Sequence, residues 1–209
     1  MQIAADSVVL EGALVVPARA SGIVLFAHGS GSSRHSPRNN FVAEALRAAG
    51  LGTLLMDLLT RQEDVSREAR FDIDLLTRRL EAATRWLVEL EQAKSLVVGY
   101  FGASTGAAAA LRAAASLGPR IGAVVSGGGR PDLAWPALRR VEAPTLLIVG
   151  GLDDVVIELN QRAYEELRAE KQLIILPGAT HLFEAPGALE DVARLAAEWF
   201  KRYLVAKKS

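Results

Sequence analysis

Short runs of apolar residues alternate along the chain with longer segments in which apolar positions recur every three or four residues. The short runs are almost continuously hydrophobic, which is typical of strands that are covered on both faces of a sheet. The longer segments have the period of amphipathic helices. This alternation predicts an α/β fold with a mostly parallel central sheet and helices on both faces.

The predicted elements follow one another almost without interruption. Strands are predicted at 22–29, 51–58, 94–101, 121–128, 143–151 and 171–178, and segment 7–17 is predicted to be a strand pair broken at Gly12. Helices are predicted at 37–50, 71–91, 104–118, 158–170 and 186–208, with a short helical stretch near 132–140. The helix at 37–50 has its cap at Ser36, Pro37 at its first position and Gly50 just past its end.

Composition narrows the classes of function. A chain of 209 residues without repeats or linkers predicts a single domain over 1–209. Lys+Arg and Asp+Glu number 24 each, so we expect neither nucleic acid nor a membrane as partner. The absence of cysteine excludes thiolate chemistry and fits a reducing compartment. With no signal-peptide pattern and no long apolar run, we expect a cytoplasmic protein.

Ligands of parallel sheets bind beyond the carboxyl ends of the strands, so the loops after the strands are the places to search for chemistry. The first candidate is "GASTG" at 102–106, which places Ser104 between Gly102 and Gly106 after a strand and before a helix. This context is that of a nucleophile elbow, in which glycines leave room for a strained serine. The alternative is that Ser104 only caps the following helix.

Two later loops hold the other candidates for a triad. Asp153 comes first in "VGGLDDVV", and Asp154 beside it is expected to cap the helix or to face solvent. His181 lies in "LPGATHLF". Taken singly, the aspartate fits turn chemistry and the histidine a surface loop. The order Ser, Asp, His after three later strands instead predicts a catalytic triad of Ser104, Asp153 and His181.

The early loop "FAHGSGSSRHSPRN" at 26–39 is predicted to complete the site. Acyl transfer needs donors for an oxyanion, and the backbone N–H groups of Ser30 and Thr105 are the candidates. Arg34 and Arg38 are candidate contacts for an acidic substrate, with solvated side chains as the alternative. His28 is predicted to be structural and His35 to lie on the surface. The spacing of His28, His35 and Asp57 does not favour a metal site, and we expect no cofactor.

These loops, together with "LLMDLLT" at 54–60, resemble the α/β-hydrolase superfamily over positions 26–184. More narrowly, the chain is similar to the small, capless serine members grouped with dienelactone hydrolase-like proteins. The resemblance implies the α/β-hydrolase fold without a cap domain. It also implies a serine esterase in which His181 takes the proton of Ser104 while Asp153 orients the imidazole. Dienelactone hydrolase itself has a cysteine nucleophile, so Ser104 points to ordinary ester chemistry.

The expected substrate is a small-molecule ester. About seventeen residues, "GGGRPDLAWPALRRVEA", separate the strand at 121–126 from the next strand, too few for a helical lid. An open cleft favours small or short-chain acyl groups. An acyltransferase, a perhydrolase or a lactone or thioester hydrolase would use the same triad, and a non-enzymatic scaffold with a residual triad is a further alternative. The sequence does not distinguish a monomer from a homodimer.

Overall fold

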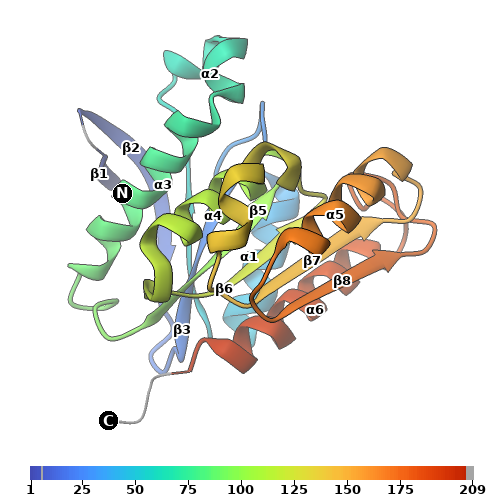
Figure 1. The fold of residues 1–209 in the computed structure, drawn as a ribbon. Coiled ribbons are helices and arrows are strands. Elements are labelled where there is room, and N and C mark those ends of the chain that lie inside the picture. Colours follow the sequence, from blue (N-terminus) through green and yellow to red (C-terminus); the bar gives the residue numbers. More distant parts are fainter. Residues whose placement is uncertain (6, 206–209) are drawn as a thin grey trace.

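A single eight-stranded sheet runs through the computed structural model, which describes residues 1–5 and 7–205 (Figure 1). The strand order is β1-β2-β4-β3-β5-β6-β7-β8. The strands are β1 (Gln2–Ala5), β2 (Val8–Val15), β3 (Gly22–Ala27), β4 (Gly52–Met56), β5 (Val97–Ala103), β6 (Ile121–Gly127), β7 (Thr145–Gly150) and β8 (Lys171–Leu176). β3 to β8 form a parallel sheet, which confirms the predicted mostly parallel architecture, and β1 and β2 add to it in antiparallel orientation.

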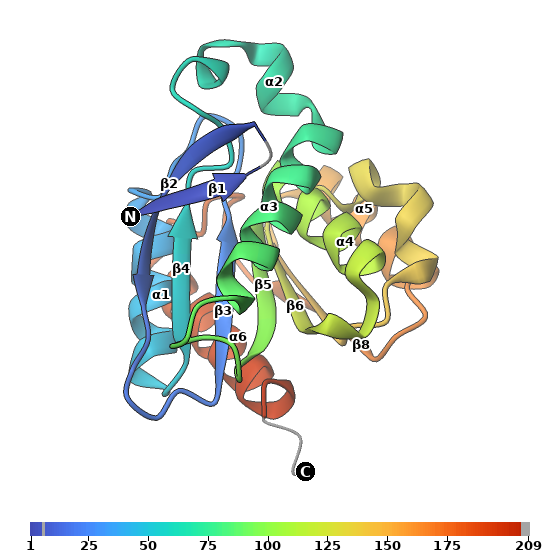
Figure 2. The same cartoon turned by 90° about the vertical axis from the view of Figure 1, so that its left-hand side faces the viewer.

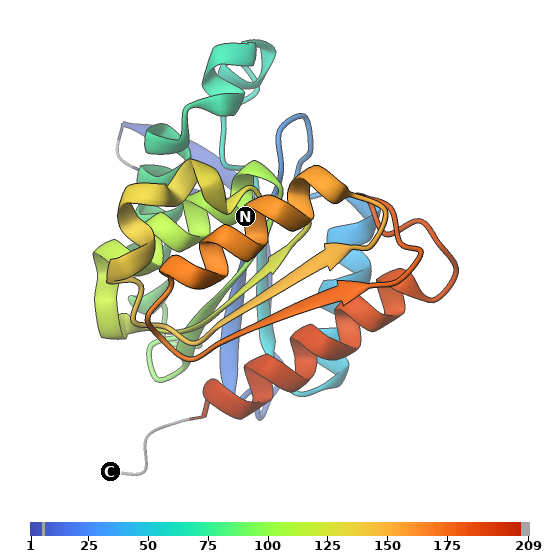
Figure 3. The ribbon, with the colours of Figure 1, turned by 45° about the vertical axis from the view of Figure 1, so that its right-hand side comes forward.

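Helices cover both faces of this sheet. The α-helices are α1 (Pro37–Ala48), α2 (Arg67–Phe71), α3 (Ile73–Val88), α4 (Thr105–Leu117), α5 (Asp154–Glu166) and α6 (Ala188–Tyr203). Short 3₁₀ helices are η1 (Glu63–Val65), η2 (Gly118–Arg120) and η3 (Pro131–Arg140). α1 and α6 pack on one face, whereas α3, α4 and α5 pack on the other (Figure 3). The predicted layered architecture is thereby confirmed.

The alanine-rich helix α4 determines how closely a helix can approach the central strand β5. Its inward residues Ala107 to Ala110, together with Ala113 and Ala114, are fully buried. Side chains this small let the helix lie close to the sheet, and close packing fixes the position of its first turn. Ser104 immediately precedes that turn, so the packing of α4 also fixes the candidate nucleophile.

The amino-terminal prediction needs a correction. Segment 7–17 is not a broken pair, because β2 continues through Gly12 and pairs with β1, which precedes it. A Cβ on Gly12 would lie 2.6 Å from Ile3 Cδ1 of β1 and 3.2 Å from Leu54 Cδ1 of β4. The glycine therefore makes room for neighbouring side chains and does not interrupt the strand.

The helix predicted at 71–91 corresponds to α3, which is shorter at both ends, and the separate short helix α2 precedes it with Asp72 between the two. The Asp72 carboxylate accepts the backbone N–H of Leu75 at 2.9 Å and so caps α3. η1 and α2 lie beyond the carboxyl ends of β3 and β4 (Figure 2).

Two further helix boundaries differ from the prediction. α5 begins at Asp154, four residues before the predicted start at 158. The last helix, predicted at 186–208, runs from Ala188 to Tyr203, and predicted residues 206–208 lie outside the described residues.

The connection between β6 and β7 contains only η3, so it provides no helical cap of its own. No helix among residues 1–5 and 7–205 has both the length and the apolar character needed to cross a bilayer. The carboxyl edge of the sheet, with its loops, is therefore the place to build the site.

Replacing the cap of α3 tests the boundary that the sequence did not predict. Asp72→Ala removes the acceptor for the Leu75 N–H, and we expect the free energy of unfolding to fall by about 1 kcal/mol in urea denaturation. Asp72→Asn keeps a side-chain oxygen and is the matched control, with a loss of a few tenths of a kcal/mol at most. Equal losses in both variants would contradict the capping role.

Candidate active site

Ser104 occupies a strained turn between β5 and α4. Its backbone has φ 49° and ψ −121°, and it is one of two non-glycine residues with positive φ in the part of the chain described. Its side chain makes no capping hydrogen bond to α4. Ser104 therefore does not cap α4 through its side chain. Its backbone geometry is that of a serine at the tip of a nucleophile elbow.

The two glycines of "GASTG" are required by close contacts. A Cβ on Gly102 would lie 2.4 Å from the Cα of Ala107. A Cβ on Gly106 would lie 2.0 Å from the carbonyl oxygen of Ala27 at the end of β3. Both obstacles are backbone atoms, so no side-chain rotation could relieve them. The glycines thus provide the clearance that the motif predicts.

His181 and Asp153 form a hydrogen-bonded pair. The distance between His181 Nδ1 and Asp153 Oδ2 is 2.6 Å. Asp153 directly precedes α5 after β7, and His181 lies in the loop after β8. Asp154 is the first residue of α5 and is exposed, so it matches the expectation of a solvent-facing neighbour. The structure thus pairs the two residues that the order of the motifs selects.

Ser104 and His181 line the same pocket, which has a volume of about 300 Å³. Within residues 1–5 and 7–205, no hydrogen bond joins Ser104 Oγ to the His181 ring. Catalytic hydrogen bonds often tighten only when substrate binds, so this geometry is compatible with proton transfer between the two. A Cβ on Gly128 would lie 3.0 Å from the His181 carbonyl oxygen, and this glycine lets the loop after β6 pass close to the histidine.

The pocket combines an apolar wall with a polar side. Its lining residues are Gly29, Ser30, Ser32, Ser36, Arg38, Asn39, Val42, Phe101, Ala103, Ser104, Gly127, Gly128, His181, Leu182, Phe183, Leu189 and Val192. No carboxylate is among them. Of these residues, only Ser30, Arg38, Ser104 and His181 were selected from the sequence as site residues, and Asn39 and Phe183 are among those that were not. Phe183 is a buried aromatic residue at φ 55°, a conformation that no sequence pattern marks.

The two predicted oxyanion donors belong to residues that contact each other. The backbone N–H of Ser30 donates to Thr105 Oγ1 at 3.0 Å. The backbone N–H of Thr105 is in the first turn of α4, where such groups have no partner within the helix. Thr105 therefore holds the early loop against the elbow through its hydroxyl.

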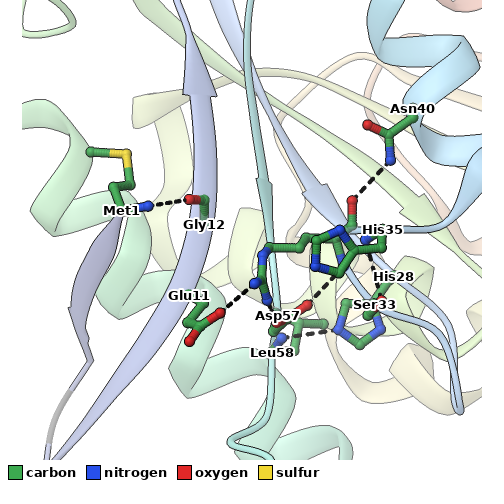
Figure 4. Close-up of polar contacts among 10 residues, drawn as sticks. Met1, Glu11, Gly12, His28, Ser33, His35, Asn40, Asp57 and Leu58 are labelled. Carbon is green, nitrogen blue, oxygen red and sulfur yellow. Dashed lines mark hydrogen bonds and ion pairs between the residues drawn. The ribbon is translucent and has the colours of Figure 1, made fainter.

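The two arginines named from the sequence have different surroundings. The Arg34 guanidinium pairs with Asp57 and Glu11, and its backbone N–H donates to Asp57 Oδ1 at 2.7 Å. Figure 4 shows these two acids close to the early loop. Arg34 does not line the pocket, so it fastens that loop to β2 and the end of β4. Arg38 lines the pocket, is exposed, and has no ion-pair partner within the described ranges.

His28 is structural, as predicted. Its Nε2 accepts the backbone N–H of Leu58 at 3.0 Å (Figure 4). This assigns the ring proton to Nδ1, which lies 2.9 Å from the Gly29 carbonyl oxygen. Burial lowers the pKa of His28, so the neutral ring is favoured. His35 is exposed. The described residues contain no cluster of three His, Cys, Asp or Glu residues able to hold a metal ion.

The strained serine, the His–Asp pair and the loops at the carboxyl edge define an α/β-hydrolase fold. The chain belongs to the dienelactone hydrolase family, whose model it matches over residues 10–204. It is similar to the crystal structure of dienelactone hydrolase from Anabaena variabilis ATCC 29413, with 58% identity, a TM-score of 0.96 and coverage of 98% of this chain and 96% of that one. Est1E from Butyrivibrio proteoclasticus shares the fold at 17% identity, with a TM-score of 0.81 and 97% of each chain covered.

The curated relatives are longer proteins. Two sequences from Mycobacterium tuberculosis, each named "Putative phosphoribosyl transferase", are 58% identical over 204 residues. The match covers 98% of this chain but 46% of each relative. This chain therefore spans about half the length of those proteins.

The neutral state of His28 gives the folded protein a dependence on pH. Because its pKa is lower in the folded than in the unfolded state, the unfolded chain binds a proton first as the pH falls below about 6.5. We expect the free energy of unfolding, measured in urea, to fall from pH 7 to pH 5, and to fall less steeply in His28→Gln.

The matched control is His35→Gln, which replaces an exposed histidine seven positions along the same loop. If His28→Gln and the wild type lose stability with the same slope, the assigned role of the buried ring is wrong.

Proposed function

We propose that this chain is a serine hydrolase that cleaves small carboxylic esters through an acyl-enzyme on Ser104. One observation carries the proposal: Ser104, held at φ 49° and ψ −121°, shares a pocket with a histidine whose Nδ1 lies 2.6 Å from a carboxylate. Membership in the dienelactone hydrolase family supports hydrolytic activity.

In the proposed reaction, Ser104 Oγ attacks the ester carbonyl carbon while His181 Nε2 takes the hydroxyl proton. Asp153 accepts the hydrogen bond of Nδ1–H, orients the ring and stabilises the imidazolium. The proton then passes to the alcohol oxygen, which leaves as the C–O bond breaks. Water, deprotonated by the same histidine, attacks the acyl-enzyme and releases the acid and the free serine.

The oxyanion is proposed to bind the backbone N–H groups of Thr105 and Ser30. The Ser30 N–H donates to Thr105 Oγ1 at 3.0 Å, so it would share its proton between that hydroxyl and the substrate oxygen. The Thr105 N–H is the donor without a competing helical partner. The scheme uses no metal or organic cofactor.

The dimensions of the pocket support small esters. A volume of about 300 Å³ is at the low end of ligand pockets, and the connection between β6 and β7 provides no lid. Arg38 is proposed to contact an acidic substituent at the rim, because it is the one arginine or lysine in the pocket lining. Arg34 is not assigned this role, since Asp57 and Glu11 neutralise it.

Other acyl acceptors would use the same acyl-enzyme. Transfer to an alcohol, an amine or hydrogen peroxide, or cleavage of a lactone or thioester, differs only in the acceptor or the leaving group. The phosphoribosyl transferase name belongs to longer relatives, and the match with this chain covers 46% of their length. We propose that any phosphoribosyl transfer in those proteins resides outside the matched half, because the geometry here suits acyl transfer.

Removing the nucleophile tests the proposal. We expect Ser104→Ala to lose hydrolysis of p-nitrophenyl acetate and covalent labelling by a fluorophosphonate probe, while circular dichroism stays that of the wild type. Wild-type protein that is not labelled would indicate a scaffold without activity. Labelling that persists in the variant would place the nucleophile elsewhere.

Substitution of the two adjacent aspartates tests which carboxylate acts as the triad acid. Asp153→Asn removes the carboxylate that holds His181, and we expect kcat to fall on the order of 10³-fold or more. Asp154→Asn, one residue later and exposed, is the matched control, with kcat within about twofold of the wild type. The reverse ranking in steady-state kinetics would move the acid to Asp154.

A further inference from the structure

Asn39 lies on the wall of the candidate active-site pocket, and its side chain is mostly buried without being fully enclosed. The residue is only 7% exposed and lines the pocket that contains Ser104. Its backbone N–H donates to Ser36 Oγ at 3.3 Å. Its carboxamide takes part in no hydrogen bond or ion pair with the residues that the structure describes.

The position of Asn39 is one at which the helix otherwise buries apolar residues. The inward face of α1 consists of Asn39, Val42, Ala43 and Leu46. Across the pocket, Leu189 and Val192 of α6 and Phe101 of β5 add apolar lining. A carboxamide with two N–H donors and an acceptor oxygen thus stands at the start of an apolar stripe, in the lining of the pocket.

From these contacts we propose that Asn39 binds a hydroxyl group of the ester, so that the pocket selects hydroxylated acyl or alcohol parts over plain alkyl ones. This inference rests on the proposed ester hydrolysis and names its substrate class. A hydroxyl both donates and accepts, which matches the two halves of the carboxamide. An alkyl group at the same place would strip Asn39 of water and leave it without a partner.

The surroundings favour a neutral group at this point. No carboxylate lines the pocket, and the Arg38 side chain is exposed. A buried charge needs a paired counter-charge, whereas a hydroxyl needs only hydrogen bonds. Asn39 therefore differs in role from Arg38, which is proposed to contact a charge at the rim.

The first test compares kcat/KM for ethyl butanoate with that for ethyl 2-, 3- and 4-hydroxybutanoate. We expect the best hydroxylated ester to be preferred by about tenfold or more in the wild type. Asn39→Leu has a similar volume and no polar atoms, and we expect the preference to fall to about one. Asn39→Ala serves as the second variant if leucine disturbs folding, and the same loss is expected.

The matched control is Asn40→Leu, one residue along the same helix. Asn40 is exposed, does not line the pocket and donates from its carboxamide to the backbone carbonyls of Arg34 and Ser36. We expect it to keep the wild-type preference. A preference that survives in both Asn39 variants, or is absent from the wild type, overturns the proposal.

A binding measurement separates this inference from the proposed function. In a Ser104→Ala background, calorimetric titration with the intact esters reports affinity without turnover. We expect tighter binding of the hydroxylated ester by about tenfold, and loss of that difference when Asn39→Leu is added. A protein that binds with this difference but hydrolyses no ester would refute the activity and retain the subsite. Hydrolysis that depends on Ser104, together with equal affinities for the hydroxylated and the plain ester, would support the activity and refute the subsite.

Discussion

The first turn of α4 touches the end of β3, and the geometry of the candidate active site depends on this contact. Gly106 lies so close to Ala27 that an added Cβ would be 2.0 Å from the Ala27 carbonyl oxygen. The approach is possible because α4 buries alanines against the sheet. It leaves the chain between β5 and α4 only a sharp turn, and Ser104 adopts a strained conformation that the surrounding packing maintains. The placement of the half-buried Ser104 in the pocket lining is a consequence of packing density.

The remaining loops are aligned with this elbow by backbone contacts of their own. The loops that carry Asp153 and His181 are joined by two backbone hydrogen bonds. Gly151 N–H donates to the Leu176 carbonyl at 2.7 Å, and Leu152 N–H donates to the Ala179 carbonyl at 3.0 Å. A Cβ on Gly150 would lie 2.3 Å from the Thr180 carbonyl oxygen, so these two loops are in direct contact. These backbone contacts, in addition to the Asp153–His181 hydrogen bond, hold the two side chains next to each other.

The strands and the candidate triad could be predicted from the sequence because both leave local signals. Buried parallel strands are continuous apolar runs, and a glycine-flanked serine between a strand and a helix is typical of a nucleophile elbow. The failures involve residues whose role depends on distant partners. Gly12 was predicted to break a strand, because the sequence does not show that Ile3 packs against it. Arg34 was predicted to contact substrate, because the sequence does not show its ion pairs with Asp57 and Glu11. Asp72 is a polar residue near the start of a helical pattern, and only its bond to the Leu75 N–H identifies it as a cap.

Asn39 and Phe183 were not predicted either, because their roles also depend on residues distant in the sequence. They show where this fold accepts a strained backbone or a polar side chain. Glycine occupies positive φ at Gly31, Gly50, Gly118, Gly128, Gly178 and Gly187. The two exceptions among the described residues, Ser104 and Phe183, both line the active-site pocket. Glycine would relieve the backbone at either position, but it would supply neither a hydroxyl nor an aromatic wall. Strain is thus tolerated where a side chain must face the pocket. An unpaired carboxamide at Asn39, on the same wall, follows the same logic if a ligand completes its hydrogen bonds.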